Sequence, residues 1–337
     1  MNDKKEILKI QDLQTSFFTD DGIIPAVDGI DFSVKEGEVL GIVGESGCGK
    51  SVTSLSIMGL VPKPPGRITG GEILFNERNL VGLDEKEMRK VRGNDIAMIF
   101  QEPMTSLNPL FTIGNQLIEA ILIHKKGWSK KQAKDRAVEM LKLVGLPRAE
   151  ELIREYPHQL SGGMRQRVMI AMALICDPKV LIADEPTTAL DVTIQAQILK
   201  LIRELNERLD TAVLLITHDL GVVAETCERV IVMYAGQIVE EGPVNVIFKD
   251  PQHPYTKGLI KSVPDVRVKK EKLYSIPGNV PKPGTVRSGC RFAARCEFAF
   301  DRCLKENPGL YETSDVHKTR CFLYDKSEVS VDDHALA

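Results

Sequence analysis

The segment Gly44–Ser51, GESGCGKS, is the part of this sequence best suited to phosphate chemistry. It fits the pattern G-x-x-x-x-G-K-[ST], follows the apolar stretch VLGIV and precedes a helix-like stretch over 52 to 60. Glycines let backbone N–H groups surround phosphate oxygens, Lys50 brings an ammonium to the outer phosphates, and Ser51 offers Mg²⁺ a hydroxyl. The predicted phosphate site comprises Gly44, Glu45, Ser46, Gly47, Cys48, Gly49, Lys50, Ser51 and Val52.

Two acidic residues follow a second apolar segment. Residues 180 to 183, VLIA, lead directly into Asp184 and Glu185. Four consecutive apolar residues predict a buried strand with both carboxylates at its exposed end. Beside a phosphate loop, the first carboxylate can bind Mg²⁺ and the second can polarise an attacking water. Strand ends of this kind are common, so the functional interpretation depends on the phosphate loop.

A third candidate group lies near the end of the chain. Four of the seven cysteines fall within 32 residues, with the spacing C-x5-C-x6-C-x17-C. This spacing is wider than the C-x2-4-C pattern of structural zinc sites. Soft thiolates in a loop-rich segment suit an iron–sulfur cluster, with zinc or unbound thiols as alternatives. We expect nearby His317 to face solvent. The predicted ligands are Cys290, Cys296, Cys303 and Cys321.

Further motifs resemble those of ATP-binding-cassette ATPases. Residues 160 to 164, LSGGM, look like the signature motif of that family, although Met164 stands where the family usually has Gln. Gln101 in IFQEP, the stretch 188 to 191 and His218 after AVLLIT occur in the order that the family shows. The resemblance covers about residues 6 to 250.

The resemblance implies roles for individual residues. Gln101 and His218 would join Glu185 in catalysis, with Gln101 touching Mg²⁺ and the water and His218 contacting the γ-phosphate. Phe17 would stack on adenine, with Phe18 as the competing choice. The implied Mg²⁺ ligands are Ser51, Gln101 and Asp184.

The same resemblance implies a site shared between two subunits. Ser161 begins a helix-like stretch, and its hydroxyl and the neighbouring N–H groups suit a γ-phosphate held by a partner. Asp191 would cross the dimer interface. The residues assigned to the partner's nucleotide are Ser161, Gly162 and Gly163.

The elements that must position these residues follow from apolar patterning. Short strand-like stretches separated by turn compositions fill residues 6 to 43, and helical spacing dominates from about 115 to 176. After that, strand and helix alternate to residue 236, which predicts a mainly parallel sheet covered by helices. We therefore predict an α/β cassette core with an N-terminal antiparallel β subdomain and an inserted helical subdomain, followed by a small loop-rich, metal-bound extension.

The tail resembles a particular branch of the family. DPQHPYTKGL (250 to 259), IPG (276 to 278) and the cysteines look like the C-terminal extension of ATPase subunits in bacterial dipeptide, oligopeptide and related nickel importers. In that branch the matching cysteines are associated with a [4Fe–4S] cluster. We expect a cassette domain over 1–250, with its helical subdomain at about 102–176, an extension over 251–325 and a frayed tail over 326–337.

Composition narrows the function classes. The 337 residues are 43% hydrophobic with a formal net charge of −3, which does not call for a nucleic-acid or anionic-membrane partner. The longest apolar run has nine residues, too few for a membrane span, and the start of the chain shows no secretory signal. We expect the chain to be peripheral, at the cytoplasmic face of the membrane.

The resemblance implies an ATPase that powers peptide import, with ATP and Mg²⁺ as cofactors. Its expected partners are a second cassette subunit (a distinct homologue, or else an identical chain), two transmembrane permease subunits and, indirectly, an extracytoplasmic peptide-binding protein. The alternatives are nickel import and a soluble ATPase acting on nucleic acid or ribosomes. Soluble ATPases of that kind usually have a long coiled coil or a second cassette, and the sequence shows neither. The cargo's length and identity do not follow from this sequence.

Overall fold

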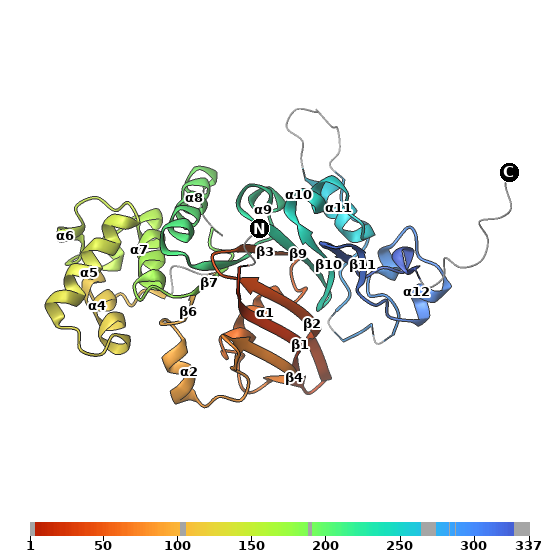
Figure 1. Ribbon diagram of the computed structural model, residues 1–337, viewed down its shortest axis with the longest axis horizontal. Coiled ribbons are helices and arrows are strands. Elements are labelled where there is room, and N and C mark those ends of the chain that lie inside the picture. The colour runs from red at the N-terminus through yellow and green to blue at the C-terminus, as the bar shows by residue number, and fades with distance from the viewer. Residues whose placement is uncertain are drawn as a thin grey trace.

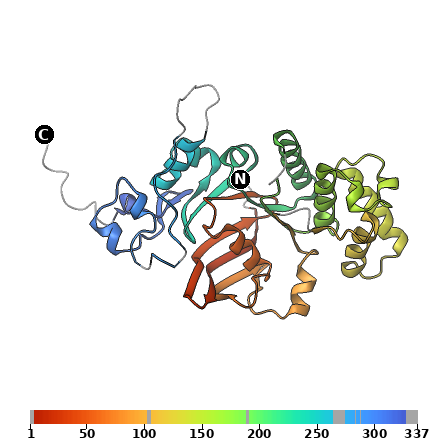
Figure 2. The ribbon, with the colours of Figure 1, turned by 180° about the vertical axis from the view of Figure 1, so that it is seen from behind.

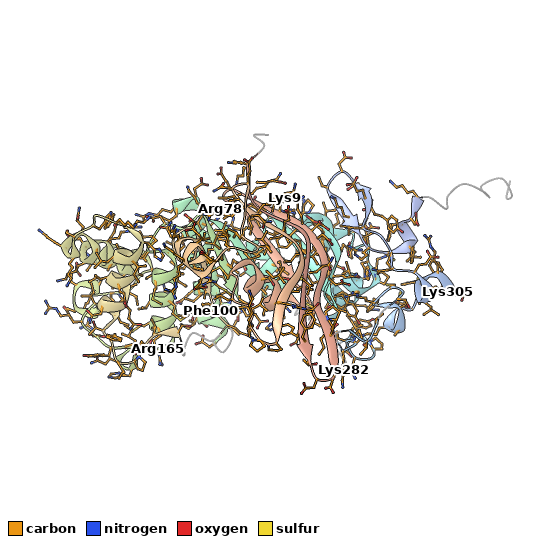
Figure 3. The ribbon with its side chains drawn as sticks, turned by 90° about the horizontal axis from the view of Figure 1, so that it is seen from below. Lys9, Arg78, Phe100, Arg165, Lys282 and Lys305 are labelled. Atoms are coloured by element: carbon orange, nitrogen blue, oxygen red, sulfur yellow. The ribbon has the colours of Figure 1, made fainter. Side chains whose placement is uncertain are left out.

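The computed structural model describes residues 4–101, 106–187, 191–263, 274–282, 284–286 and 288–326. Figure 1 shows an elongated molecule with a block of helices at one end, two sheets in the middle and the C-terminal segment at the other end. Figure 2 shows the same order from behind. Seen from below in Figure 3, Arg165 lies in the helical block and Lys305 at the opposite end. The strands that carry the candidate site residues are therefore central.

The larger sheet has eight strands in the order β11-β12-β10-β9-β3-β8-β7-β6. Its middle is parallel, and β3, β7 and β8 are buried along their whole length because both faces of the sheet are covered. Adjacent residues of one strand enter different cores, as with Leu181 and Ile182. The parallel strands are β3 (Val39–Val43), β6 (Ile96–Ile99), β7 (Val180–Asp184), β8 (Ala212–Ile216) and β9 (Arg229–Tyr234).

The second sheet is antiparallel, with the strand order β2-β1-β4-β5. Helix α1 (Lys50–Ile57) begins at the last two residues of the phosphate loop and contacts both sheets. Its Ser56 shares a buried hydrogen bond of 2.8 Å with Thr15 of β1. Helix α2 (Glu85–Val91) precedes β6. The strands are β1 (Glu6–Thr19), β2 (Gly22–Lys35), β4 (Gly66–Phe75) and β5 (Arg78–Asn79).

The helical block contains α4 (Ile113–His124), α5 (Lys130–Leu143), α6 (Ala149–Leu152) and α7 (Gly162–Leu174). Thr112, Ser129 and Ser161 cap three of these helices by accepting backbone N–H groups with their hydroxyls. A short 3₁₀ turn, Pro157–Gln159, precedes α7. Helices α8 (Val192–Leu209) and α9 (Leu220–Thr226) follow β7 and β8 in turn. The first residues of the expected helical subdomain, 102 to 105, lie outside the described residues.

The C-terminal part is tied to the larger sheet. Strand β10 (Gln237–Pro243) pairs antiparallel with β9, and β12 (His317–Thr319) pairs with β10 through Glu240↔Thr319 and Glu241↔Lys318. Strand β11 (Tyr311–Ser314) completes this edge. The sequence predicted only a loop-rich tail and not these two strands. The remaining elements are α10 (Val244–Lys249), α11 (Pro254–Ser262), α12 (Asp301–Lys305) and the 3₁₀ turns Ala293–Arg295 and Phe322–Tyr324.

His317 corrects one sequence-based expectation. Its side chain is 3% exposed, and its Nε2 lies 2.8 Å from Oε1 of fully buried Glu240. The same carboxylate accepts the backbone N–H groups of Gln252 and His253, at 2.6 and 3.0 Å. His317 therefore faces the interior because Glu240 provides it with a partner there, and together they attach the tail to β10.

Candidate nucleotide site

The phosphate loop connects β3 to α1, and its backbone requires glycine. Gly44 has φ +155°, and a Cβ there would lie 2.2 Å from the carbonyl oxygen of Met233. Gly49 has φ +106°, and its Cβ would lie 2.6 Å from the Ala26 oxygen. The ammonium of Lys50, which is 5% exposed, donates hydrogen bonds to the carbonyls of Gly44 and Glu45 at 2.7 and 3.2 Å. The loop thus curves around the lysine, with N–H groups available for an anion.

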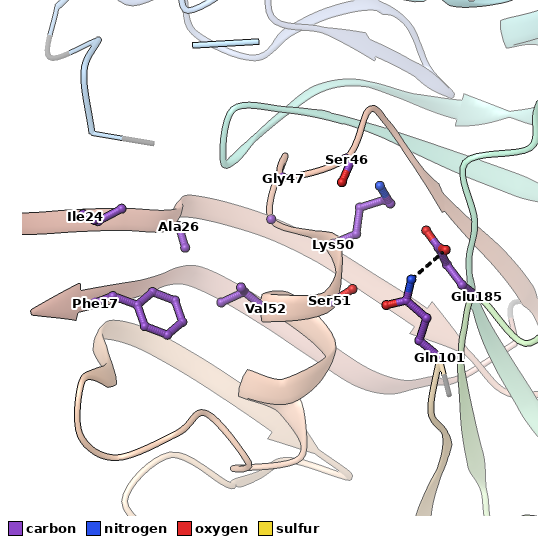
Figure 4. Close-up of a pocket in the computed structure, with 11 residues that line it drawn as sticks. Phe17, Ile24, Ala26, Ser46, Gly47, Lys50, Ser51, Val52, Gln101 and Glu185 are labelled. Atoms are coloured by element: carbon purple, nitrogen blue, oxygen red, sulfur yellow. Dashed lines mark hydrogen bonds between the residues drawn. The ribbon is translucent and has the colours of Figure 1, made fainter. Parts of the chain in front are cut away.

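A cavity of about 280 Å³ opens beside this loop. Figure 4 shows its two ends: Phe17, Ile24, Ala26 and Val52 on one side, and Lys50, Ser51, Gln101 and Glu185 on the other. One end is therefore apolar and the other is polar and charged. An elongated ligand with a flat apolar group and an anionic end fits this distribution.

The structure distinguishes between the two candidate aromatic residues. Phe17 lines the cavity and pairs across the strands with Ile24, which lines it too. The ring of Phe18 lies instead beneath the guanidinium of Arg67, at 3.9 Å from the ring centroid. Sequence reasoning missed Ile24 and Ala26, although the alternation of β2 and its turn at 20 to 21 could have pointed to them.

Asp184 ends β7 directly beneath the loop. The Ser51 hydroxyl donates to one of its carboxylate oxygens and the Ser54 hydroxyl to the other, each at 3.2 Å. Burial raises the pKa of Asp184 above its usual range, although both hydroxyls act in the opposite direction. The serine hydroxyl and the carboxylate together offer the hard oxygen ligands that Mg²⁺ prefers. Ser54 was not among the predicted residues, and only its position one helical turn after Ser51 hints at its role.

Glu185, the next residue, adopts the left-handed φ of +47° and donates its backbone N–H to Ile216 of β8 at 2.9 Å. Its carboxylate accepts a hydrogen bond from Nε2 of Gln101 at 3.1 Å, drawn as a dashed line in Figure 4, and lies 3.3 Å from Nδ1 of His218. The structure therefore brings together three predicted residues that are far apart in the sequence. Residues 188 to 190 lie outside the described residues.

The signature residues lie elsewhere. Ser161 is exposed and caps α7, accepting the N–H of Met164 at 3.3 Å, and Gly162 and Gly163 form the first turn of that helix. Asp191 caps α8 in the same way, accepting the N–H of Ile194 at 3.0 Å. None of these residues lines the cavity at the phosphate loop. Within this chain, the structure does not bring them to the nucleotide site.

The four tail cysteines line one small cavity, together with Phe292 and Phe322. Burial raises the pKa of Cys290 and Cys296, and raises that of Cys321 to about 11. Among the described residues, no group of three or more His, Cys, Asp and Glu side chains is arranged to hold a metal ion. Among these described residues the structure therefore does not support the metal-bound extension that the sequence predicts.

Comparison with known proteins identifies the class. A model of the ABC transporter family matches residues 27–188, over the phosphate loop and the Asp184–Glu185 strand end. The solved structure of a dimeric bacterial ABC transporter cassette superposes with a TM-score of 0.62 at 33% identity, covering 70% of this chain and 98% of that one. The chain belongs to the ABC transporter family, as an ATP-binding cassette protein.

Closer relatives define the branch. The oligopeptide transport ATP-binding protein AppD of Bacillus subtilis (strain 168) is 54% identical over 320 residues, covering 95% of this chain and 97% of AppD. The dipeptide transport protein DppD of the same organism is 54% identical over 322 residues, 96% of each chain. A model described as oligopeptide/dipeptide transporter, C-terminal region, matches residues 239–303. These relatives do not favour the alternative of an ATPase acting on nucleic acid or ribosomes.

In the part of the chain that the structure describes, no helix is long and apolar enough to span a membrane.

Proposed function

We propose that this chain hydrolyses ATP and thereby powers the import of di- and oligopeptides through a membrane permease complex. The observation that carries the proposal is the position of Glu185, in contact with Gln101 and His218 and lining the same cavity as Lys50. A carboxylate fixed in this way can orient a water toward the outer phosphate that Lys50 binds. The names of the relatives AppD and DppD support the peptide cargo.

Other residues of the cavity hold the nucleotide. Phe17, Ile24 and Ala26 provide an apolar wall for adenine, and the N–H groups of the loop surround the phosphates. The residues that would hold Mg²⁺ are Ser51, Gln101 and Asp184, whose oxygen atoms suit a hard cation. When bound, Mg²⁺ neutralises charge that develops on the phosphates.

Two cassette subunits complete each site. Ser161, Gly162 and Gly163 of one chain bind the γ-phosphate held by the other, and Asp191 lies at the interface between them. Ser161, Gly162 and Asp191 are exposed, and all four residues lie at helix N-termini outside the cavity of their own chain, which supports this assignment. The partner is a distinct homologous subunit or, alternatively, a second copy. ATP binding closes the pair, and hydrolysis reopens it.

The domain boundaries and the cellular location belong to the same proposal. The cassette spans residues 1–250, and its helical subdomain, about 102–176, passes motion to two permease subunits. The extension spans 251–325, and 326–337 form a tail. The chain lies at the cytoplasmic face of the membrane, and an extracytoplasmic binding protein delivers the peptide to the permeases.

The test is co-purification with tagged permease subunits, followed by peptide uptake into vesicles that contain the complex. We expect the chain to be recovered with the permeases and uptake of a labelled tri- or pentapeptide to require ATP on the cassette side. Uptake that proceeds equally without ATP, or ATP-dependent uptake of nickel but no peptide, would overturn the proposed function.

A second proposal concerns the tail. Cys290, Cys296, Cys303 and Cys321 bind a [4Fe–4S] cluster, with zinc as the alternative. The four thiols line one cavity, and backbone N–H groups two residues further on, as at Phe292 and Phe298, hydrogen-bond the sulfur atoms, although burial raises the pKa of these thiols overall. Such a donor set suits a soft metal centre, which would stabilise this segment.

Anaerobic purification tests the metal centre. Iron and sulfide at about four each per chain, with broad visible absorption that Cys303→Ser removes, would support the cluster. Zinc at a stoichiometric amount would instead support the alternative, a zinc site. If the protein contained neither iron nor zinc, both the cluster and the zinc site would be ruled out.

A further inference from the structure

The C-terminal segment contacts the phosphate loop at one residue, Glu45. Arg295 forms a two-pronged ion pair with it, Nη1 to Oε2 at 2.8 Å and Nη2 to Oε1 at 3.1 Å. The Arg295 side chain is only 4% exposed, and that of Glu45 is 31% exposed. Paired hydrogen bonds between guanidinium and carboxylate fix orientation as well as neutralising charge. A residue 250 positions further along the chain therefore controls a side chain of the phosphate loop.

The position of Arg295 is itself fixed. It ends the short turn Ala293–Arg295, and its remaining N–H groups donate to the carbonyls of Pro277 and Ile276 at 2.9 and 3.3 Å. Nη1 also lies 3.3 Å from the Tyr234 hydroxyl. These contacts leave little freedom for the guanidinium to follow Glu45 if the loop moves.

A second contact holds the backbone of the same residue. The N–H of Glu45 donates to the Tyr255 hydroxyl at 2.8 Å, and Tyr255 is fully buried. Its ring packs against Tyr234 and Phe292, with centroid distances of 4.6 and 5.5 Å. Phe292 belongs to the cysteine segment, so that segment supports both contacts to Glu45. The phosphate loop is held from outside the cassette core at its main chain and its side chain.

The charge of Glu45 explains why such contacts matter. Glu45 brings a negative charge into the phosphate loop between Gly44 and Ser46, although it does not itself line the cavity, and a charge near the loop repels a bound triphosphate. Pairing with Arg295 offsets this repulsion and holds the carboxylate on the side of the tail. Loss of Arg295 would leave a partly buried negative charge in the phosphate loop without this ion pair.

We propose that Arg295 and Tyr255 are positioning residues of the nucleotide site, through which the C-terminal segment sets the affinity of the phosphate loop for ATP. This inference rests on the proposed ATP binding. It differs from the view that the tail is an appendage independent of the nucleotide site. The structure of the segment around Cys296, adjacent to Arg295, thereby influences nucleotide binding.

The experiment measures the dissociation constant of Mg²⁺ and a non-hydrolysable ATP analogue on the full chain, by titration calorimetry. Arg295→Ala should weaken binding about tenfold, and the loss should shrink at high salt because the repulsion is screened. Arg295→Lys, which keeps the charge but not the paired geometry, should fall in between. Tyr255→Phe, which keeps the ring, should weaken binding about threefold.

A double variant separates charge from folding. Adding Glu45→Gln to Arg295→Ala removes the unpaired carboxylate and should recover most of the lost affinity. If Arg295→Ala lowered affinity only by damaging the structure, the second substitution would not restore it. Arg302→Gln is the matched control, because Arg302 pairs with Glu306 and Asp325 within the tail. The affinity of this variant for the ATP analogue should stay within about twofold of wild type.

Two results would overturn the inference while leaving the proposed function intact: wild-type affinity in Arg295→Ala, or no recovery in the double variant. Failure of the unmodified chain to bind the analogue at all would instead overturn the nucleotide site itself. Melting curves show whether each variant is folded. If Arg295→Ala does not fold, the affinity of Tyr255→Phe still tests the inference.

Discussion

Asp184 combines a functional position with a cost in stability. It is 4% exposed, and burial raises its pKa above the ordinary value of 3.8 despite hydrogen bonds from Ser51 and Ser54. Because the folded pKa lies above the unfolded one, the folded state binds the proton more tightly. The contribution of Asp184 to stability is therefore complete below about pH 3.8 and is lost as pH rises through the folded pKa.

Asp184→Asn removes that charge and should raise the melting temperature of the nucleotide-free protein at neutral pH by about 2 °C, while Mg²⁺-dependent hydrolysis is lost. The difference from wild type should narrow as pH falls toward 3.8, which scanning calorimetry over a pH series can follow. Asp21→Asn, in the exposed β1–β2 turn, serves as the control. A lower melting temperature for Asp184→Asn than for wild type at neutral pH would contradict the conclusion that the charge of Asp184 destabilises the nucleotide-free protein.

At this scale, the sequence could predict only residues whose type and spacing are local signals. The spacing from Gly44 to Ser51 and the position of Asp184 after an apolar run both belong to this group. Ile24 and Ser54 could not be found in the same way, because they reach the site only through the β1–β2 register and the packing of α1 under β7. Phe17 and Phe18 have the same type and adjacent positions, so only the geometry of the strand distinguishes them.

At the scale of elements, the attachment of the tail depends on one buried carboxylate. Glu240 of β10 is fully buried and accepts the backbone N–H groups of Gln252 and His253 as well as contacting His317 of β12. Removal of this acceptor leaves one buried backbone donor, that of His253, and one partly buried donor, that of Gln252, without their partner, at about 1–3 kcal/mol for a fully buried group.

Glu240→Leu should therefore loosen the segment after residue 250 while the cassette stays folded. Limited proteolysis should cleave that segment several times faster than in wild type, with cleavage sites located by mass spectrometry. Glu312→Leu on β11 is the control. Glu312 is exposed, and among the described residues it forms an ion pair only with Lys318, at 3.5 Å. Equal cleavage of the two variants would show that Glu240 does not hold the tail.

Element prediction succeeded where the signal was a long apolar pattern. The buried strands β3, β7 and β8 and the long helix α8 coincide with stretches that sequence patterning assigned. Strands β11 and β12 were missed because they are short and polar, and only pairing with distant β10 makes them strands. The turn Ala293–Arg295, which positions Arg295, was not predicted either, because three residues are too few to give a periodic signal.

At the scale of the whole molecule, the position of Ser161 outside the cavity predicts a function divided between two chains. Ser161→Arg should leave nucleotide affinity of the isolated chain within about twofold of wild type, while the added charge and bulk prevent the two cassettes from closing. Titration on the isolated chain and size-exclusion chromatography of the pair with ATP measure the two effects. A tenfold loss of binding in the isolated chain would contradict the assignment across the interface.

The most direct test of the account is ATP turnover by Glu185→Gln in the assembled transporter. Glu185 contacts Gln101 and His218, whereas Lys50 donates to the carbonyls of Gly44 and Glu45. We therefore expect the variant to bind Mg-ATP as wild type does, to lose at least about a hundredfold in hydrolysis and to accumulate the closed pair. Lys50→Ala should instead weaken binding itself. Hydrolysis by Glu185→Gln at the wild-type rate would contradict the central claim that this carboxylate orients the attacking water.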